Sequence, residues 1–447
     1  MFGTGRSFAL IDAKKVLETL GKHQLVDGYP LVLDLEKSNG PWLVDAATGD
    51  SYLDAFTCFA SWPIGFNHSM MADKAFQSRL LTAALNKPAN SDLYTQDMAD
   101  FVDAFGSRVT PDNYPYHFWV SGGSLAVENA LKVSFDWKAR KLGRTDFTEN
   151  VNDLVILHFR QAFHGRSGYT MSLTNTLPDK IGLFPKFDWP CVHNPAMVVD
   201  NDGNIVNDIE AEEAKAREEI EAAFSKHNNK IAAIIIEPMQ GEGGDNHFRK
   251  EFMQALRKYA DDNEALLIFD EVQTGFYGSG KPWLFQHIGV EPDVVCFGKK
   301  TQVCGVFANR RVDEVEEHVF VRSSRINSTW GGNLVDMVRC KRFIEIIEQE
   351  NLAENITKRG AQLKEGLREL SREKDAFSNV RGIGSFVAFT CESPEARDRM
   401  LSDMFADKLM ALGAGPDSVR FRLPLIIGES EINTILEKVA NATMAKV

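Results

Sequence analysis

Cysteine is scarce in this sequence, and long apolar runs are absent. The six cysteines lie singly along 447 residues, with neither a Cys-x-x-Cys pair nor the Cys/His spacing of a zinc site, so we expect a reducing compartment and no metal site. The N-terminal segment lacks the apolar core of a secretory signal, and runs such as ALLIF are far too short to span a membrane. We therefore expect a cytoplasmic protein.

Positive charge is also in short supply. The chain has 50 Lys and Arg residues against 63 Asp and Glu residues, a formal net charge of -13 at pH 7. No cluster of basic residues offsets this locally, so a polyanionic partner would be repelled, which excludes nucleic acid and anionic membranes. The composition is near the soluble average, which excludes collagen-like and disordered chains, and the length predicts roughly two to three domains.

Four short runs are apolar throughout, which is typical of strands buried on both faces of a sheet. They cover residues 154–159, 231–236, 265–269 and 294–297. Amphipathic stretches, with apolar residues three and four apart, begin at Leu125, Glu212 and Phe248. This β-α-β order predicts an α/β fold whose large domain holds a mostly parallel sheet covered by helices.

The pattern changes after Gly332. Two long helical segments, 334–350 and 356–374, precede the Gly-rich VRGIGSFVAF and the strand-like VRFRLPLII. They predict a smaller, discontinuous α+β domain that includes the N-terminal strand runs, because two short strands cannot form a stable unit alone. We expect an N-terminal arm with part of the small domain at 1–75, a large domain at 76–332 and the C-terminal part of the small domain at 333–447.

Charged residues stand where three of these strands end, which is the edge at which an open α/β sheet binds ligands. Residues 231–236 lead into Glu237, 265–269 into Asp270, and 294–297 into Gly298 and Lys299. Taken alone, the aspartate could cap a turn and the lysine could be solvated. A carboxylate and a lysine at one edge together favour a catalytic site.

Two Gly-rich turns are candidate phosphate sites. The turn 121–124 (SGGS) follows the strand-like YHFWV and opens a helix, so backbone N–H groups and a serine hydroxyl would converge there. Residues 275–281 have the spacing of a nucleotide P-loop, but Pro282 replaces the Ser/Thr that binds Mg²⁺, which favours a surface turn. A P-loop nucleotide-binding protein is therefore the weaker alternative.

A phosphate site, a strand-end carboxylate, a strand-end lysine and the aromatic-His-Gly-Arg of residues 163–166 form the set that pyridoxal 5'-phosphate requires. Such an enzyme needs a lysine for the Schiff base, a carboxylate to keep the pyridine nitrogen protonated, and donors for the phosphate. No single motif is decisive, and the ordered combination points to this cofactor.

The sequence resembles the class III pyridoxal-phosphate aminotransferases of fold type I, from about residue 30 to about residue 425. The matching motifs are SGGSLAVENALK, AFHGRSGYTMSLT, IIEPMQGEGG, LLIFDEVQTGFYGSG, PDVVCFGKK, NSTWGGN and VRFRLPL. One departure is Leu125, where the family has an acidic residue. We expect no effect on the chemistry, because the phosphate contacts come from the backbone and Ser124.

The resemblance implies roles for residues around the cofactor. Lys299 would form the Schiff base, with Lys300 as the fallback. Asp270 would pair with the pyridine nitrogen, and Gln273 would bond the phenolic oxygen. The other implied contacts are the ring sandwich of Phe163 and Val272, and the phosphate donors Gly123, Ser124 and, from a neighbouring subunit, Thr329. A homodimer with a shared active site follows from this.

The resemblance also implies how substrates are held. Arg166 would bind a distal carboxylate and Arg420 a proximal one, with Glu242 as the modulator of Arg420 and a further catalytic candidate. Asn327, from the NSTWGGN motif, is a further substrate-binding candidate. The alternative for Arg420 and Arg422 is an ordinary pair of surface arginines on an edge strand.

Longer sequence segments indicate which substrates to expect. ALNKPANSDLY, FPKFDWP, FGKKTQVCG and RINSTWGGNLVDMVR most resemble family members that move the 6-amino group of L-lysine to 2-oxoglutarate, giving 2-aminoadipate 6-semialdehyde and L-glutamate. Another ω-amine, ornithine or 4-aminobutyrate, is the alternative within the family. A decarboxylase or mutase on the same fold is the alternative outside it.

Overall fold

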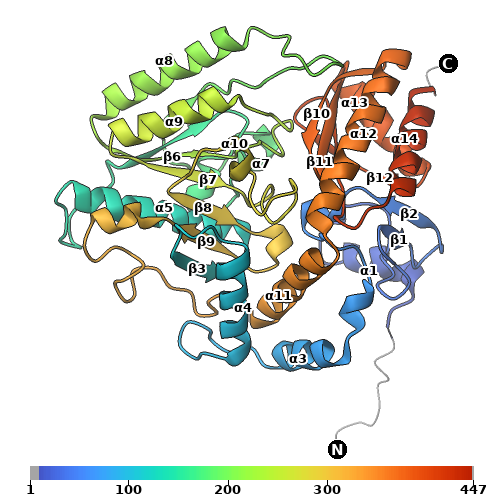
Figure 1. The fold of residues 1–447 in the computed structure, drawn as a ribbon, viewed down its shortest axis with the longest axis horizontal. Helices are drawn as coiled ribbons and strands as arrows, with labels where there is room; N and C mark the ends of the chain where they lie inside the picture. Colours follow the sequence, from blue (N-terminus) through green and yellow to red (C-terminus); the bar gives the residue numbers. More distant parts are fainter. Residues whose placement is uncertain (1–9, 445–447) are drawn as a thin grey trace, which may run out of the picture.

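The computed structural model describes residues 10–444, which form three sheets with helices packed against them (Figure 1). The largest sheet has the strand order β3-β9-β8-β7-β6-β4-β5. Its strands are β3 (Tyr116–Val120), β4 (Val155–Phe159), β5 (Cys191–Val192), β6 (Ile231–Ile236), β7 (Leu266–Asp270), β8 (Val294–Phe297) and β9 (Cys304–Ala308). All four apolar runs predicted from the sequence are strands of this sheet.

Strands β5, β4, β6, β7 and β8, in that order across the sheet, run parallel to their neighbours. β9 runs antiparallel to both β3 and β8. Helix α5 (Gly123–Lys141) covers one face of the sheet, and α8 (Ile209–His227) and α9 (Lys250–Asp262) cover the other (Figure 1). The predicted α/β class with a mostly parallel sheet is confirmed. β9, a short strand whose second residue is Gly305, is not among the predicted strands.

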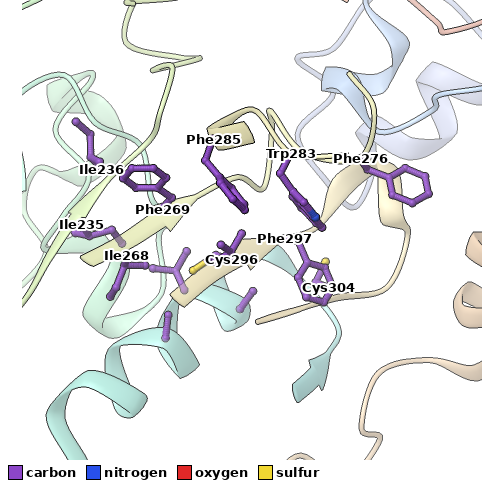
Figure 2. Packing of buried hydrophobic residues seen from close by; sticks show 14 of the residues in the cluster. Ile235, Ile236, Ile268, Phe269, Phe276, Trp283, Phe285, Cys296, Phe297 and Cys304 are labelled. Atoms are coloured by element: carbon purple, nitrogen blue, oxygen red, sulfur yellow. The ribbon is translucent and has the colours of Figure 1, made fainter. Parts of the chain in front are cut away.

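The turn that follows β7 belongs to the core of this sheet. Trp283 is fully buried, with its ring centroid 6.1 Å from that of Phe297 (Figure 2). Phe276 is also fully buried, and its N–H donates to the carbonyl of Pro282 at 2.6 Å. A Cβ atom on the first glycine of segment 275–282 would lie 2.4 Å from Trp283. The prediction of a surface turn is therefore wrong, because this segment packs inside the molecule.

There are two smaller sheets, one built from C-terminal strands alone and one that combines strands from both ends of the described chain. β10 (Phe377–Ile383), β11 (Phe386–Cys391), β14 (Ser418–Arg422) and β13 (Leu412–Ala414) form an antiparallel sheet in that order. β1 (Trp42–Val44) pairs with β2 (Ser51–Asp54), and β12 (Leu409–Met410) extends this pair in parallel with β2. The blue N-terminal strands in Figure 1 accordingly lie beside the orange and red C-terminal elements. The predicted small α+β part drawn from both ends is confirmed.

Helices connect and cover these sheets. The others are α1 (Val16–Gly21), α2 (Thr57–Ala60), α3 (Lys74–Leu85), α4 (Gln96–Arg108), α6 (Gly168–Met171), α7 (Pro178–Ile181), α10 (Phe285–Ile288), α11 (Leu334–Gln349), α12 (Leu352–Lys374), α13 (Pro394–Ala406) and α14 (Glu429–Met444). Within residues 10–444 no helix combines the length and apolar character needed to cross a bilayer. Because α11 packs against both α3 and α4, the boundary at 332/333 and the other domain limits stay a prediction.

A substitution at Gly305 can measure how tightly β9 packs between its neighbouring strands. A Cβ atom there would lie 2.2 Å from the carbonyl oxygen of Phe118 and 2.7 Å from the ring of Phe297. We predict that Gly305→Ala lowers the free energy of unfolding by about 1–3 kcal/mol, the usual effect of overpacking a core. Chemical denaturation measures this.

Gly106→Ala, in α4, is the matched control for Gly305→Ala. A Cβ atom at Gly106 meets nothing within 4 Å, and alanine stabilises a helix interior by about 0.5–1 kcal/mol relative to glycine. The control should therefore be as stable as the parent or more so. Equal destabilisation by both changes would contradict the packing argument.

Candidate active site

The carboxyl ends of β6, β7 and β8 meet the N-terminus of α5 around a cavity of about 240 Å³. Every site residue predicted from the sequence lines this cavity except Arg166, Asn327 and Thr329. Those three are exposed on the single chain. Contacts of Asn327 and Thr329 with a neighbouring subunit's site therefore stay a prediction, as does the carboxylate-binding role of Arg166.

Lys299 follows β8 in a strained backbone conformation. Its φ angle of 54° lies in the left-handed region, which residues other than glycine rarely adopt. The preceding Gly298 has no room for a side chain, since a Cβ atom would lie 2.9 Å from Sγ of Cys304. Burial, reinforced by Arg420 and Arg422, lowers the pKa of Lys299 to about 8. A lysine with a lowered pKa at a cavity wall is suited to act as a nucleophile.

Lys300, the fallback for this role, has a different environment. Its Nζ donates to the backbone carbonyl of Gln273 at 2.5 Å and lies 4.7 Å from the centre of the Phe386 ring. Burial holds the pKa of Lys300 well below its usual value. Because Lys300 does not line the cavity, the geometry favours Lys299 as the reactive lysine.

Asp270, the last residue of β7, is buried and fixed through both oxygens. Oδ2 lies 2.8 Å from Nδ1 of His164, and Oδ1 accepts from the N–H of Val272 at 3.0 Å. The second contact is the turn cap considered as an alternative for this aspartate, and it leaves the carboxylate facing the cavity. The sequence analysis gives His164 no separate role, yet this imidazole orients the carboxylate.

Glu237 is a second buried carboxylate that sequence analysis leaves without a role. It accepts from the N–H of Phe163 at 2.9 Å and from the N–H of Gly241 at 3.0 Å. Burial raises the pKa of Glu237 to about 7. It therefore ties the segment after β4 to the loop after β6 and holds Phe163 at the cavity wall. Its position directly after a buried strand was the signal for it.

Arg422 and Asp245 form a buried ion pair at the junction between the large sheet and β14. Two nitrogens of Arg422 donate to the two oxygens of Asp245 at 2.7 and 2.5 Å. Arg422 also donates to Oε1 of Gln273 at 2.6 Å. Because the amide oxygen of Gln273 is held in this way, its N–H groups remain to donate toward an acceptor in the cavity.

Arg420 is buried but poorly partnered. Within residues 10–444 the Arg420 side chain makes one hydrogen bond, from Nη1 to Oε1 of Gln273 at 3.4 Å, and its buried Nε has no partner. Burial, reinforced by Arg422, lowers the pKa of Arg420 to about 10. Since β14 lies between β11 and β13, the alternative of surface arginines on an edge strand is wrong for both Arg420 and Arg422. A guanidinium placed like this is ready for an external carboxylate.

Glu242, expected to modulate Arg420, has other hydrogen-bond partners in the structure. Oε1 accepts from Oγ1 of Thr176 at 3.0 Å and from Nζ of Lys180. Arg420 lies close enough for an electrostatic interaction with Glu242, but no hydrogen bond joins them. In the structure, Glu242 is thus hydrogen-bonded to Thr176 and Lys180 and not to Arg420.

The N-terminus of α5 opens into the same cavity through Gly123 and Ser124. No side chain caps this helix, and its first turn holds no acidic residue. Gly123 packs against Val272 so closely that a Cβ atom would lie 2.9 Å from that side chain. Ser124 adds a hydroxyl to the free backbone N–H groups. This end of the cavity can therefore hold a phosphate.

A comparison with family models matches residues 25–443 to the description "Aminotransferase class-III", so the chain belongs to this family. It is 49% identical over 432 residues to the L-lysine-epsilon aminotransferase of Amycolatopsis lactamdurans, covering 96% of this chain and 95% of the relative. It is 47% identical to that of Mycobacterium tuberculosis (strain ATCC 25618 / H37Rv), with the same coverage. A solved lysine aminotransferase from M. tuberculosis superposes with a TM-score of 0.92 at 46% identity, covering 97% of this chain and 100% of that one.

Class III aminotransferases use pyridoxal 5'-phosphate, and the cavity suits that cofactor. It offers an uncapped helix N-terminus for the phosphate, an oriented carboxylate at Asp270 and an amine at Lys299. Phe163 and Val272 supply apolar walls for a ring. The donor set therefore fits the group that the family implies.

The lowered pKa of Lys299 generates a pH prediction. An amine attacks an aldehyde only when it is neutral, and an ordinary lysine is neutral mainly above about pH 10.4. We predict that the rate at which the apoprotein takes up pyridoxal phosphate rises with pH, is half-maximal near pH 8 and levels off about one unit higher. Stopped-flow absorbance measures the rate.

Arg420→Gln should move this pH profile upward, because the neighbouring positive charge that disfavours protonated Lys299 is removed. Arg310→Gln changes an exposed arginine outside the cavity and serves as the control. A rate that keeps rising toward pH 10 in the parent protein would contradict the assignment of a lowered pKa to this lysine.

Proposed function

We propose that this protein transfers the 6-amino group of L-lysine to 2-oxoglutarate, giving 2-aminoadipate 6-semialdehyde and L-glutamate. The observation that carries the proposal is the buried, poorly partnered Arg420 in the same cavity as Lys299 and Asp270. An arginine there suits an acceptor whose carboxylate stands directly beside the reacting carbonyl, as in 2-oxoglutarate. The choice of L-lysine as donor is supported by the names of relatives that match almost the whole chain.

Bound pyridoxal phosphate supplies an electrophilic carbon and a ring that withdraws electrons. Lys299 would hold this group covalently, and its amine, once released, would move the proton during the amino transfer. Asp270 would keep the ring nitrogen protonated, because a buried carboxylate stabilises an adjacent positive charge. Gln273 would donate to the phenolic oxygen through its free amide N–H groups, and Gly123 and Ser124 would hold the phosphate.

Two carboxylate positions follow from the two substrates. L-Lysine presents its 6-amino group to the site with its carboxylate at the far end, which suits Arg166 at the exposed side. 2-Oxoglutarate places a carboxylate on Arg420. During the lysine half-reaction Arg420 would be an uncompensated buried charge, and Glu242 then serves as its counterion.

The proposal includes a homodimer with a shared active site and a cytoplasmic location. Asn327 and Thr329 lie in an exposed segment that also presents Trp330, a large apolar side chain that is 42% exposed. An apolar anchor beside polar donors suits a subunit contact, with Thr329 contributing to the neighbouring phosphate site and Asn327 to its substrate. The scattered cysteines support a reducing location.

Glutamate formation from a panel of amines tests the proposed reaction. The purified holoenzyme is mixed with 2-oxoglutarate and L-lysine, L-ornithine or 4-aminobutyrate, and L-glutamate is measured. We expect L-lysine to give the highest kcat/KM and Lys299→Ala to abolish turnover, while Lys300→Met keeps the covalent cofactor bond. A higher kcat/KM for ornithine or 4-aminobutyrate would mean that this amine, and not L-lysine, is the amino donor. If no amine gave glutamate, the proposed activity would be refuted.

Asp270→Asn tests the electrostatic role of the carboxylate. A neutral amide keeps the shape but cannot stabilise a protonated ring nitrogen, and removing one partner of a buried ion pair costs about 3–5 kcal/mol. Since each 1.4 kcal/mol is about tenfold in rate, we expect kcat to fall by at least about a hundredfold. Circular dichroism checks that the fold is intact. Retention of more than about a tenth of the activity would make Asp270 purely structural.

A further inference from the structure

Lys180 is a charged residue next to Glu242 and Phe163, two residues of the cavity wall, and the proposed chemistry does not use it. It lies in the short helix α7, which begins with Pro178 at its first turn. Its Nζ pairs with Glu242 and lies 5.8 Å from the centre of the Phe163 ring. Thr176, just before the helix, donates to the same carboxylate oxygen at 3.0 Å. Two donors from one segment thus converge on Glu242.

The two cations available to Glu242 differ in how well water can reach them. The side chain of Lys180 is 32% exposed, whereas Arg420 is only 4% exposed and its Nε has no partner. Water can solvate Lys180 when its carboxylate leaves, but it cannot do the same for Arg420. Moving Glu242 from Lys180 to Arg420 therefore exposes no buried, uncompensated charge.

We propose that Lys180 and Thr176 form a docking point that holds Glu242 away from Arg420 while 2-oxoglutarate occupies the site. This inference rests on the proposed function. With the glutamate docked there, Arg420 is free to take the carboxylate of the acceptor. When L-lysine is bound, Glu242 leaves the docking point and neutralises Arg420. Lys180 is a positioning residue, because it acts through Glu242 and not on the substrate.

The docking point determines what fraction of the enzyme can bind the acceptor. A ligand that needs a free Arg420 has an apparent Kd equal to its intrinsic Kd divided by the fraction of molecules with Glu242 docked. Loss of Lys180 lowers that fraction and weakens acceptor binding. The lysine half-reaction, which uses the other arrangement, is not weakened.

Binding of glutarate to the holoenzyme tests this directly. Glutarate is a dicarboxylate that lacks the reacting carbonyl, so calorimetry measures its Kd without turnover. We expect Lys180→Met to raise this Kd about twofold to fivefold, the upper part of the range for an ion pair that water can reach. Thr176→Val should act in the same direction with a smaller effect. The single-turnover rate with L-lysine should stay within about twofold of the parent.

Lys186→Met is the matched control, because Lys186 is an exposed lysine of the same connecting segment and does not line the cavity. It should leave both measurements unchanged. An unchanged glutarate Kd in Lys180→Met, or equal losses in glutarate binding and the lysine half-reaction, would overturn the proposal.

The Glu242→Gln background separates docking from direct contact with substrate. A neutral side chain does not need a counterion, so adding Lys180→Met to Glu242→Gln should leave the glutarate Kd unchanged. A full additional loss in the double variant would mean that Lys180 binds the ligand itself and would refute the docking point. The amine panel, read on the parent protein, tests the proposed function independently of these outcomes.

Discussion

The buried ion pair between Arg422 and Asp245 is the interaction on which the site depends. It joins β14 of the small sheet to the loop that follows β6 of the large sheet, with both side chains almost completely shielded from water. Removing either partner would leave a buried charge, at a cost of about 3–5 kcal/mol. The pair also fixes Gln273, because Arg422 holds its amide oxygen. The relative placement of the two sheets and the orientation of a cofactor-facing amide therefore share one cause.

A second consequence is that Arg420 and Arg422, both on β14, differ in their hydrogen-bond partners. Arg422 has a complete bidentate partner, while Arg420, two residues away on the same face, has one long hydrogen bond. Asp245 lies near both arginines, but its oxygens bond Arg422. Burial lowers the pKa of Lys299, and the two cations lower it further. The same pair of charges thus prepares a carboxylate site and a reactive amine. Glu242, which pairs with Lys180, lies near enough to Arg420 to interact with it electrostatically.

Local patterns explain what could be predicted from the sequence. The strand before Lys299 is apolar throughout, so its end and the lysine after it are visible in a few consecutive letters. The same holds for Asp270 and for the helix after the SGGS turn. β9 escaped prediction because it is short and carries Gly305, and its place between β3 and β8 depends on packing against Phe118 and Phe297. The buried turn 275–282 escaped for the same reason, since its glycines resemble those of an exposed loop.

Side-chain pairing across long stretches of sequence could not be read in this way. Asp245 lies in the loop after β6 and Arg422 at the end of β14. Nothing in the sequence next to either residue indicates its partner. Lys180 looks like an ordinary solvated lysine in a polar segment, and only the folded chain places it against Glu242. The residue types needed for the chemistry are therefore local, whereas their charge states are set by distant partners.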